Sequence, residues 1–187
     1  MGHKSALSEL REFLNKQLES LNPSEQVRHL KSESDRSAMI LHAAHVEQSL
    51  FWALKQQMVD INNKEKERLF GYGGPLGTFS SRILLAHGLG IIERPIRRKI
   101  AIIKEIRNTA AHAHDKLQFD TPEIKNAVSA IFGTQDAFEV RSWPKNDVRL
   151  AFGMSCTLIA HCVFNPDKFV KFDGLLDSIK DVQARRE

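Results

Sequence analysis

The chain is organised around the stretch Ile100-Ala101-Ile102-Ile103-Lys104-Glu105-Ile106-Arg107-Asn108-Thr109-Ala110-Ala111-His112. A helix turns about 100° per residue, so the apolar positions of this stretch fall on one side. Arg107 falls in the same stripe, at the spacing of a buried face, where a leucine would be expected. The full stripe comprises Ile96, Ile100, Ile103, Arg107 and Ala110.

A cation on a core-facing stripe is costly unless a carboxylate pairs with it. We expect Glu47 to be that partner, because it is the one carboxylate in an apolar ladder of the preceding long helix. Asn108 and His112 are four residues apart and stack on an adjacent face. The predicted polar cluster is therefore Glu47, Arg107, Asn108 and His112. Two interpretations stay open: a structural ion pair that locks two helices, or a catalytic or ligand-binding site.

Apolar periodicity predicts an all-α bundle of about six or seven helices, without a convincing strand. The helix expected near residues 35–62 is apolar over most of its circumference, which favours the centre of a bundle or a homodimer interface. The predicted organisation is an N-terminal helical arm over residues 1–32, a bundle core over 33–165 and a C-terminal helical tail over 166–187. The further helices of the core are expected at about 79–89, 95–113, 122–132 and 147–164.

Residues 62–78 are expected to be irregular. The charged run 63–68 is interpreted as a solvated segment, and it precedes a loop with four glycines and a proline. A glycine loop before a helix can cradle a phosphate on backbone N–H groups. No Lys-Ser/Thr pair follows this loop and no βαβ unit surrounds it, so we interpret it as a tight turn between helices.

The composition is mildly basic, with a net charge of +4 and a pI near 9.1 over 187 residues. This balance permits contact with nucleic acid without requiring it. The outer side of the helix at 95–113 offers the one candidate surface, and no helix-turn-helix or zinc-finger spacing accompanies it. The possible nucleic-acid contacts are Arg94, Arg97, Arg98 and Lys99.

Other classes of site and compartment are not indicated. No apolar run approaches the roughly 20 residues that span a bilayer, and the N-terminus lacks the apolar core of a signal peptide, so we expect a cytoplasmic protein without a membrane partner. Cys156 and Cys162 are six apart on a predicted helix, which favours buried free thiols. His42 and His45 have the spacing of metal ligands but lack a third, so we predict no metal and no cofactor.

The segment Arg107-Asn108-Thr109-Ala110-Ala111-His112 resembles the Arg-x4–6-His signature of HEPN domains. That resemblance implies an all-helical and usually dimeric fold. In HEPN members with RNase activity, the arginine and histidine form a metal-independent endonuclease site that is often composite across the dimer. It makes Arg107 and His112 candidate catalytic residues. Five residues of separation put them about 140° apart, so they converge only at a helix end or across two copies.

A second resemblance covers about residues 30–125. The segments 74–83, 89–92, 106–112 and 119–124, with the preceding helix at 33–54, look like a block of the mannitol operon repressor-like (MltR) family. This resemblance implies a transcriptional regulator. Our first hypothesis is thus a non-enzymatic regulator that acts mainly through protein or oligomer contacts, in which Arg107→Ala lowers the melting temperature markedly. The alternative is a HEPN-type endoribonuclease, toxin-like or defence-like, that uses Arg107 and His112.

Overall fold

The computed structural model describes residues 33–132 and 147–164. The chain divides into two compact units, Met1–Ser34 and Asp35–Glu187, and the helices described below belong to the second. The predicted arm at 1–32 and tail at 166–187 lie outside the described residues.

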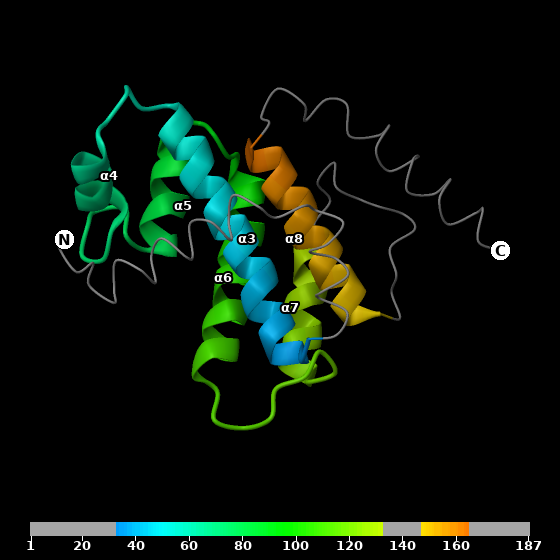
Figure 1. Cartoon of the computed structure of the whole chain (residues 1–187). Coiled ribbons are helices and arrows are strands. Elements are labelled where there is room, and N and C mark those ends of the chain that lie inside the picture. Colours follow the sequence, from blue (N-terminus) through cyan, green and yellow to red (C-terminus); the bar gives the residue numbers. More distant parts are fainter. Residues whose placement is uncertain (1–32, 133–146, 165–187) are drawn as a thin grey trace, which may run out of the picture. The chain divides into compact units, whose positions relative to one another are not determined.

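Six α-helices and no strand make up the described part of the chain, which confirms the predicted all-α class (Figure 1). None of these helices has the length and apolar character needed to cross a membrane. In chain order the helices are α3 (Asp35–Gln56), α4 (Asn63–Phe70), α5 (Phe79–Gly88), α6 (Arg94–His112), α7 (Pro122–Phe132) and α8 (Val148–Phe164).

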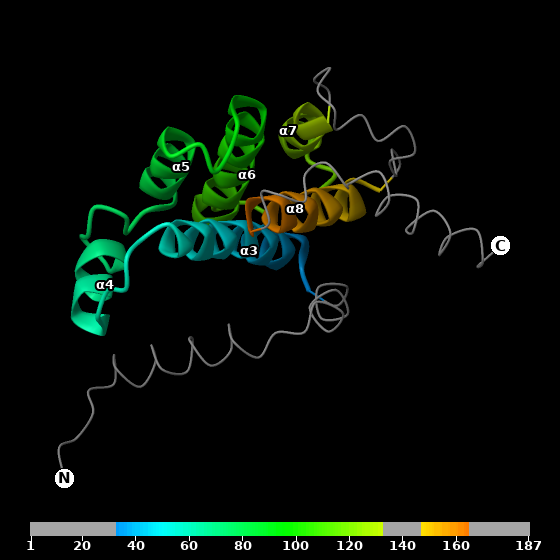
Figure 2. The ribbon, with the colours of Figure 1, turned by 90° about the horizontal axis from the view of Figure 1, so that it is seen from above.

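Helix α3 is the centre of the bundle. It packs most extensively on α8 and then on α6 and α5. Seen from above, α3 and α8 form one layer, and α5, α6 and α7 form the other (Figure 2). The apolar circumference of α3 is explained by this position, because α3 contacts both its own layer and the next. The largest fully buried side chains include Met39, Leu50, Leu54, Ile100, Ile103 and Phe152.

The prediction of one long helix to residue 62 was wrong. Helix α3 ends at Gln56, and the segment expected to be irregular begins a separate helix, α4. Helix α4 begins with a capping box: the Asn62 side chain accepts hydrogen bonds from the backbone N–H groups of Lys64 and Glu65, and Glu65 accepts one from Asn62 N. Such a box satisfies donors at a helix start and so stabilises a new helix.

The other helix boundaries follow their local signals. Pro95 lies in the first turn of α6, as expected for a residue that lacks a backbone N–H. Asp147 precedes α8, and its carboxylate accepts a hydrogen bond of 2.8 Å from Leu150 N. Gly90 follows α5 with a φ of 73°, a conformation that glycine adopts at little cost.

The glycine loop between α4 and α5 is a tight turn, as predicted. Gly73 has a φ of 78°. At Gly74, a Cβ atom would lie 2.5 Å from Arg68 O and 2.6 Å from Leu69 O, so only glycine fits against the end of α4. Leu76 N then donates to Leu69 O at 2.8 Å, which folds the loop back onto α4.

Candidate functional site

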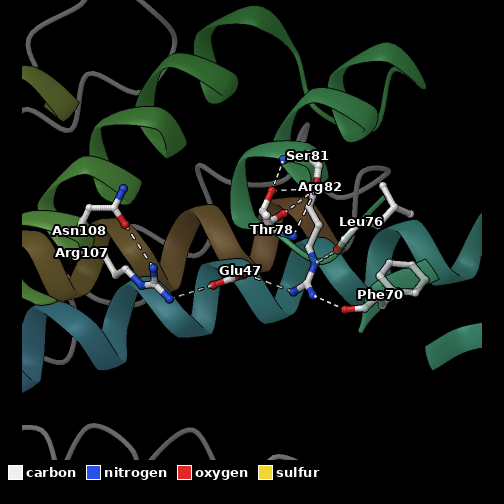
Figure 3. A network of polar contacts seen from close by, with 8 residues as sticks. All are labelled: Glu47, Phe70, Leu76, Thr78, Ser81, Arg82, Arg107 and Asn108. Carbon is white, nitrogen blue, oxygen red and sulfur yellow. Dashed lines mark hydrogen bonds and ion pairs between the residues drawn. The ribbon is translucent and has the colours of Figure 1, made fainter. Parts of the chain in front are cut away.

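A polar network joins α3, α5 and α6, with Glu47 between two arginines (Figure 3). Arg82 Nη1 on α5 lies 3.4 Å from Glu47 Oε1. On the other side, Arg107 Nη2 on α6 lies 4.0 Å from Glu47 Oε2. Arg107 Nη1 also donates to Asn108 Oδ1 at 3.2 Å. The structure thus brings together Glu47, Arg107 and Asn108, and it adds Arg82.

Arg82 is the member of this network that sequence reasoning missed. Its side chain is 13% exposed. Its Nε donates to Leu76 O at 2.8 Å and its Nη2 to Phe70 O at 3.4 Å, so it binds both ends of the glycine loop. The guanidinium also lies over the rings of Phe51 and Phe70, 5.7 and 5.9 Å from their centroids. Burial lowers the pKa of Arg82, and the charge of Glu47 opposes that shift.

The sequence contains a pattern from which Arg82 could have been predicted. It follows Phe79 by three residues and precedes Ile83, and both of these are buried. A helical wheel therefore puts Arg82 at the border of the core-facing side of α5. Arg82, like Arg107, is thus a cation beside apolar, core-facing positions of its helix.

Arg107 is less buried than its place in the apolar stripe predicted. Its side chain is 39% exposed, although Ile96, Ile100, Ile103 and Ala110 are buried as expected. The long stem of an arginine lets the charged end reach water while the apolar part stays on the helix. The expectation of a core-buried cation was wrong. Arg107 instead makes a long ion pair at the edge of the bundle, which carries little stability.

His112 does not join the network. It is the last residue of α6 and is exposed. Among the described residues, no side-chain hydrogen bond or ion pair connects His112 to Glu47, Arg107 or Asn108. Because α6 stays helical to its end, the two side chains leave it about 140° apart. Within one copy of the chain, Arg107 and His112 are not assembled around a common atom.

A second polar cluster, also missed by sequence reasoning, holds the segment that follows His112. Arg36 Nη2 donates to Ala113 O and to Asp115 O, both at 2.7 Å. The carboxylate of Asp35 accepts hydrogen bonds from Phe119 N at 3.0 Å and from Arg149 Nη1 at 2.8 Å. The start of α3 thereby ties the connection between α6 and α7 to the bundle.

The predicted basic face of α6 is present in part. Arg94, Arg97 and Arg98 are exposed. Lys99 is only 4% exposed, and its Nζ donates to Ile131 O at 2.6 Å. A lysine suits this place, because the last carbonyls of α7 carry the negative end of the helix dipole. Lys99 is therefore a structural cation, and its prediction as a nucleic-acid contact was wrong.

His42 lies against α8. Its ring meets that of Phe152 edge-on, with centroids 6.0 Å apart, and the absence of a side chain at Gly153 leaves room for it. Burial lowers the pKa of His42 to about 4, and the charges of His45 and Arg149 add to the shift. No group of three or more His, Cys, Asp or Glu residues suited to a metal ion occurs within residues 33–132 and 147–164. Cys156 and Cys162 are free, buried thiols, as predicted.

Comparison with known proteins identifies the fold. No protein-family model matches the chain, and no curated protein matches it significantly. The chain is similar to a chain in the X-ray structure of the MtlR–HPr complex from Escherichia coli, with a TM-score of 0.58 and 18% sequence identity. The match covers 72% of this chain and 92% of that chain.

The class defined by these helices is an all-α bundle. Within that class the fold is MtlR-like, which confirms the fold that the MltR resemblance implied.

Proposed function

We propose that this protein is a non-enzymatic regulator of the MltR-like type, which acts through contacts with another protein or with a second copy of itself. The likeness in fold to a chain of the MtlR–HPr complex supports this proposal, because that likeness extends over 92% of the neighbour's chain. Proteins with one fold can have different functions, so the geometry of the candidate site has to support the same function.

The divergence of Arg107 and His112 on α6 is the observation that carries the proposal. General acid–base catalysis requires the catalytic groups within hydrogen-bond reach of one reacting position. Arg107 is turned towards Glu47 and Asn108, whereas the exposed His112 ends the helix and, among the described residues, makes no side-chain hydrogen bond or ion pair with either of them. Glu47 also shares its carboxylate with Arg82. This arrangement suits a cluster that joins three helices better than it suits an RNase site.

The similar chain comes from a complex that contains HPr, so an HPr-type protein is the first partner to test. We expect isothermal titration calorimetry of this chain with the HPr protein of its own organism to give saturable binding. The expected Kd is roughly 1–100 μM, as is common for transient regulatory contacts. A titration without heat or any other sign of binding at millimolar HPr contradicts the assignment of this partner.

The alternative function is a HEPN-type metal-independent endoribonuclease. One observation favours it: α6 ends at His112, and both His112 and part of Arg107 reach water. Because α6 stays helical to His112, the pair does not converge within one copy, so this alternative requires a homodimer that apposes two copies of α6. In that case the histidine would transfer the proton of a 2′-hydroxyl and the arginine would stabilise the charged phosphorane.

A further inference from the structure

Three arginines on the outer side of α6 form a compact positive surface, which we call the arginine face: Arg94, Arg97 and Arg98. All three are exposed. Arg97 and Arg98 diverge by about 100° around the helix, and Arg94 lies between these two directions one turn earlier. Five residues of α-helix rise by only about 6 Å, so the three charges share one small area.

Within residues 33–132 and 147–164, no carboxylate pairs with the charges of the arginine face. Among the described residues, none of the three arginines makes an ion pair or a side-chain hydrogen bond. Glu105, on the same side of α6, is paired with Lys104 at 2.8 Å. Glu93 is then the remaining carboxylate at this end of the helix. Arginines that serve the fold behave differently, since Arg36 and Arg82 each bind backbone carbonyls.

The position of these arginines is unfavourable for the isolated helix. Cations in the first turn oppose the helix dipole, and like charges three or four residues apart repel one another. The first turn of α6 contains no acidic residue, and Glu93 at the N-cap is the one carboxylate next to these three arginines in the sequence. The arginine face makes no polar side-chain contact with the described part of the bundle, so its three guanidinium groups are available to an anionic group in solution.

We propose that an acidic segment of a partner protein docks on the arginine face. This inference rests on the proposed function, for which it names the docking surface and the charge of the partner. Arginine is enriched among the residues that dominate protein interfaces, and its planar fork binds carboxylates through two parallel hydrogen bonds. Three adjacent guanidinium groups can therefore bind the carboxylates of a short run of Asp and Glu side chains.

Nucleic acid fits the arginine face less well. Three arginines neutralise at most about three phosphates, which is fewer than the roughly 6–10 contacts of strong duplex binders. Single strands are held by stacking on aromatic side chains, and α6 contains no Phe, Tyr or Trp. Lys99, which would have extended the surface, is buried. A protein partner is therefore the occupant that the arginine face favours.

The test compares two charge-matched triple variants by fluorescence anisotropy. Arg94→Gln/Arg97→Gln/Arg98→Gln removes the arginine face, and Lys64→Gln/Arg68→Gln/Lys125→Gln removes three exposed cations from α4 and α7. The probes are a labelled oligoglutamate peptide and a labelled short duplex DNA. We expect the parent to bind the peptide, the arginine variant to lose roughly tenfold or more in affinity, and the control variant to stay within about twofold. Circular dichroism checks that both variants are folded, and Arg97→Gln/Arg98→Gln replaces the triple variant if it is not.

Three results would overturn the inference: no peptide binding by the parent, an equal loss in both triple variants, or DNA binding that depends on the arginine face without peptide binding. The proposed function is tested separately by the HPr titration. HPr bound equally well by the parent and the arginine variant would leave the regulator in place and reject this docking surface. An HPr titration without binding, alongside peptide binding that depends on the arginines, would reject HPr as the partner and leave the docking surface in place.

Discussion

Replacing Arg82 with alanine is expected to lower the free energy of unfolding by about 3 kcal/mol. The substitution leaves the carbonyls of Leu76 and Phe70 without their guanidinium donor, and it leaves Glu47 without its nearer cation. It also removes the stacking of the guanidinium over two buried aromatic rings. Urea denaturation followed by circular dichroism measures this loss.

Arg107→Ala is the matched control, because Arg107 contacts the same carboxylate from the exposed side. We expect it to cost about 0.5 kcal/mol, as for a surface ion pair. This reverses the expectation from sequence, in which Arg107 was the buried cation. Equal losses in the two variants, or a larger loss for Arg107→Ala, would contradict the assignment of Arg82 as the anchor of the network.

Acid is expected to destabilise the fold through His42. Folding lowers the pKa of His42 from 6.5 to about 4, so the folded state favours the neutral ring. The stabilising contribution is complete above the unfolded pKa, and it is lost as the pH falls from about 6.5 towards 4. For a half-buried ring we expect this loss to be on the order of 2 kcal/mol. Urea denaturation at pH 7 and at pH 4.5 measures it.

His42→Gln isolates this contribution, because glutamine does not titrate and carboxylates elsewhere respond to acid in both proteins. We expect the loss of stability between the two pH values to be smaller in His42→Gln than in the parent. His112→Gln, with an exposed ring at the end of α6, is the control and should behave like the parent. An unchanged pH dependence in His42→Gln would show that the His42 ring is accessible to protons in the folded state.

The polar network around Arg82 also fixes the glycine loop to the bundle. Arg82 binds Leu76 O within the loop, and it shares Glu47 with Arg107 on α6. The loop, α3 and the end of α6 are therefore connected by side chains with net positive charge. A substitution in this loop should weaken the bundle at its centre, because α3 contacts both layers.

Most of the fold could be predicted from the sequence because its signals are local. The starts of α5, α6, α7 and α8 follow from residue types that favour the first turn of a helix or the position before it. These residues are Thr78, Pro95, Pro122 and Asp147. The break between α3 and α4 was missed because the Asn62 capping box competes with an apolar pattern that continues past Gln56. A short box of polar residues is a weaker signal than a long apolar run.

The candidate site was predictable only in part, because it depends on tertiary contacts. Glu47 and Arg107 could be paired from their helical faces. The packing of α5 and α6 on α3 decides whether Arg82 or Arg107 is the more buried partner of Glu47. The periodicity of the sequence does not contain that information. Lys99 was misassigned for the same reason, since its partner Ile131 lies 32 residues away on another helix.

The RNase alternative makes the sharpest contrast with the proposed function, and one measurement decides between them. Purified protein is incubated with single-stranded and structured RNA in the presence of EDTA, next to a folded His112→Ala variant. The divergence of Arg107 and His112 on α6 predicts that the RNA stays intact with both proteins. Cleavage by the parent that disappears in His112→Ala would contradict the account and identify a ribonuclease.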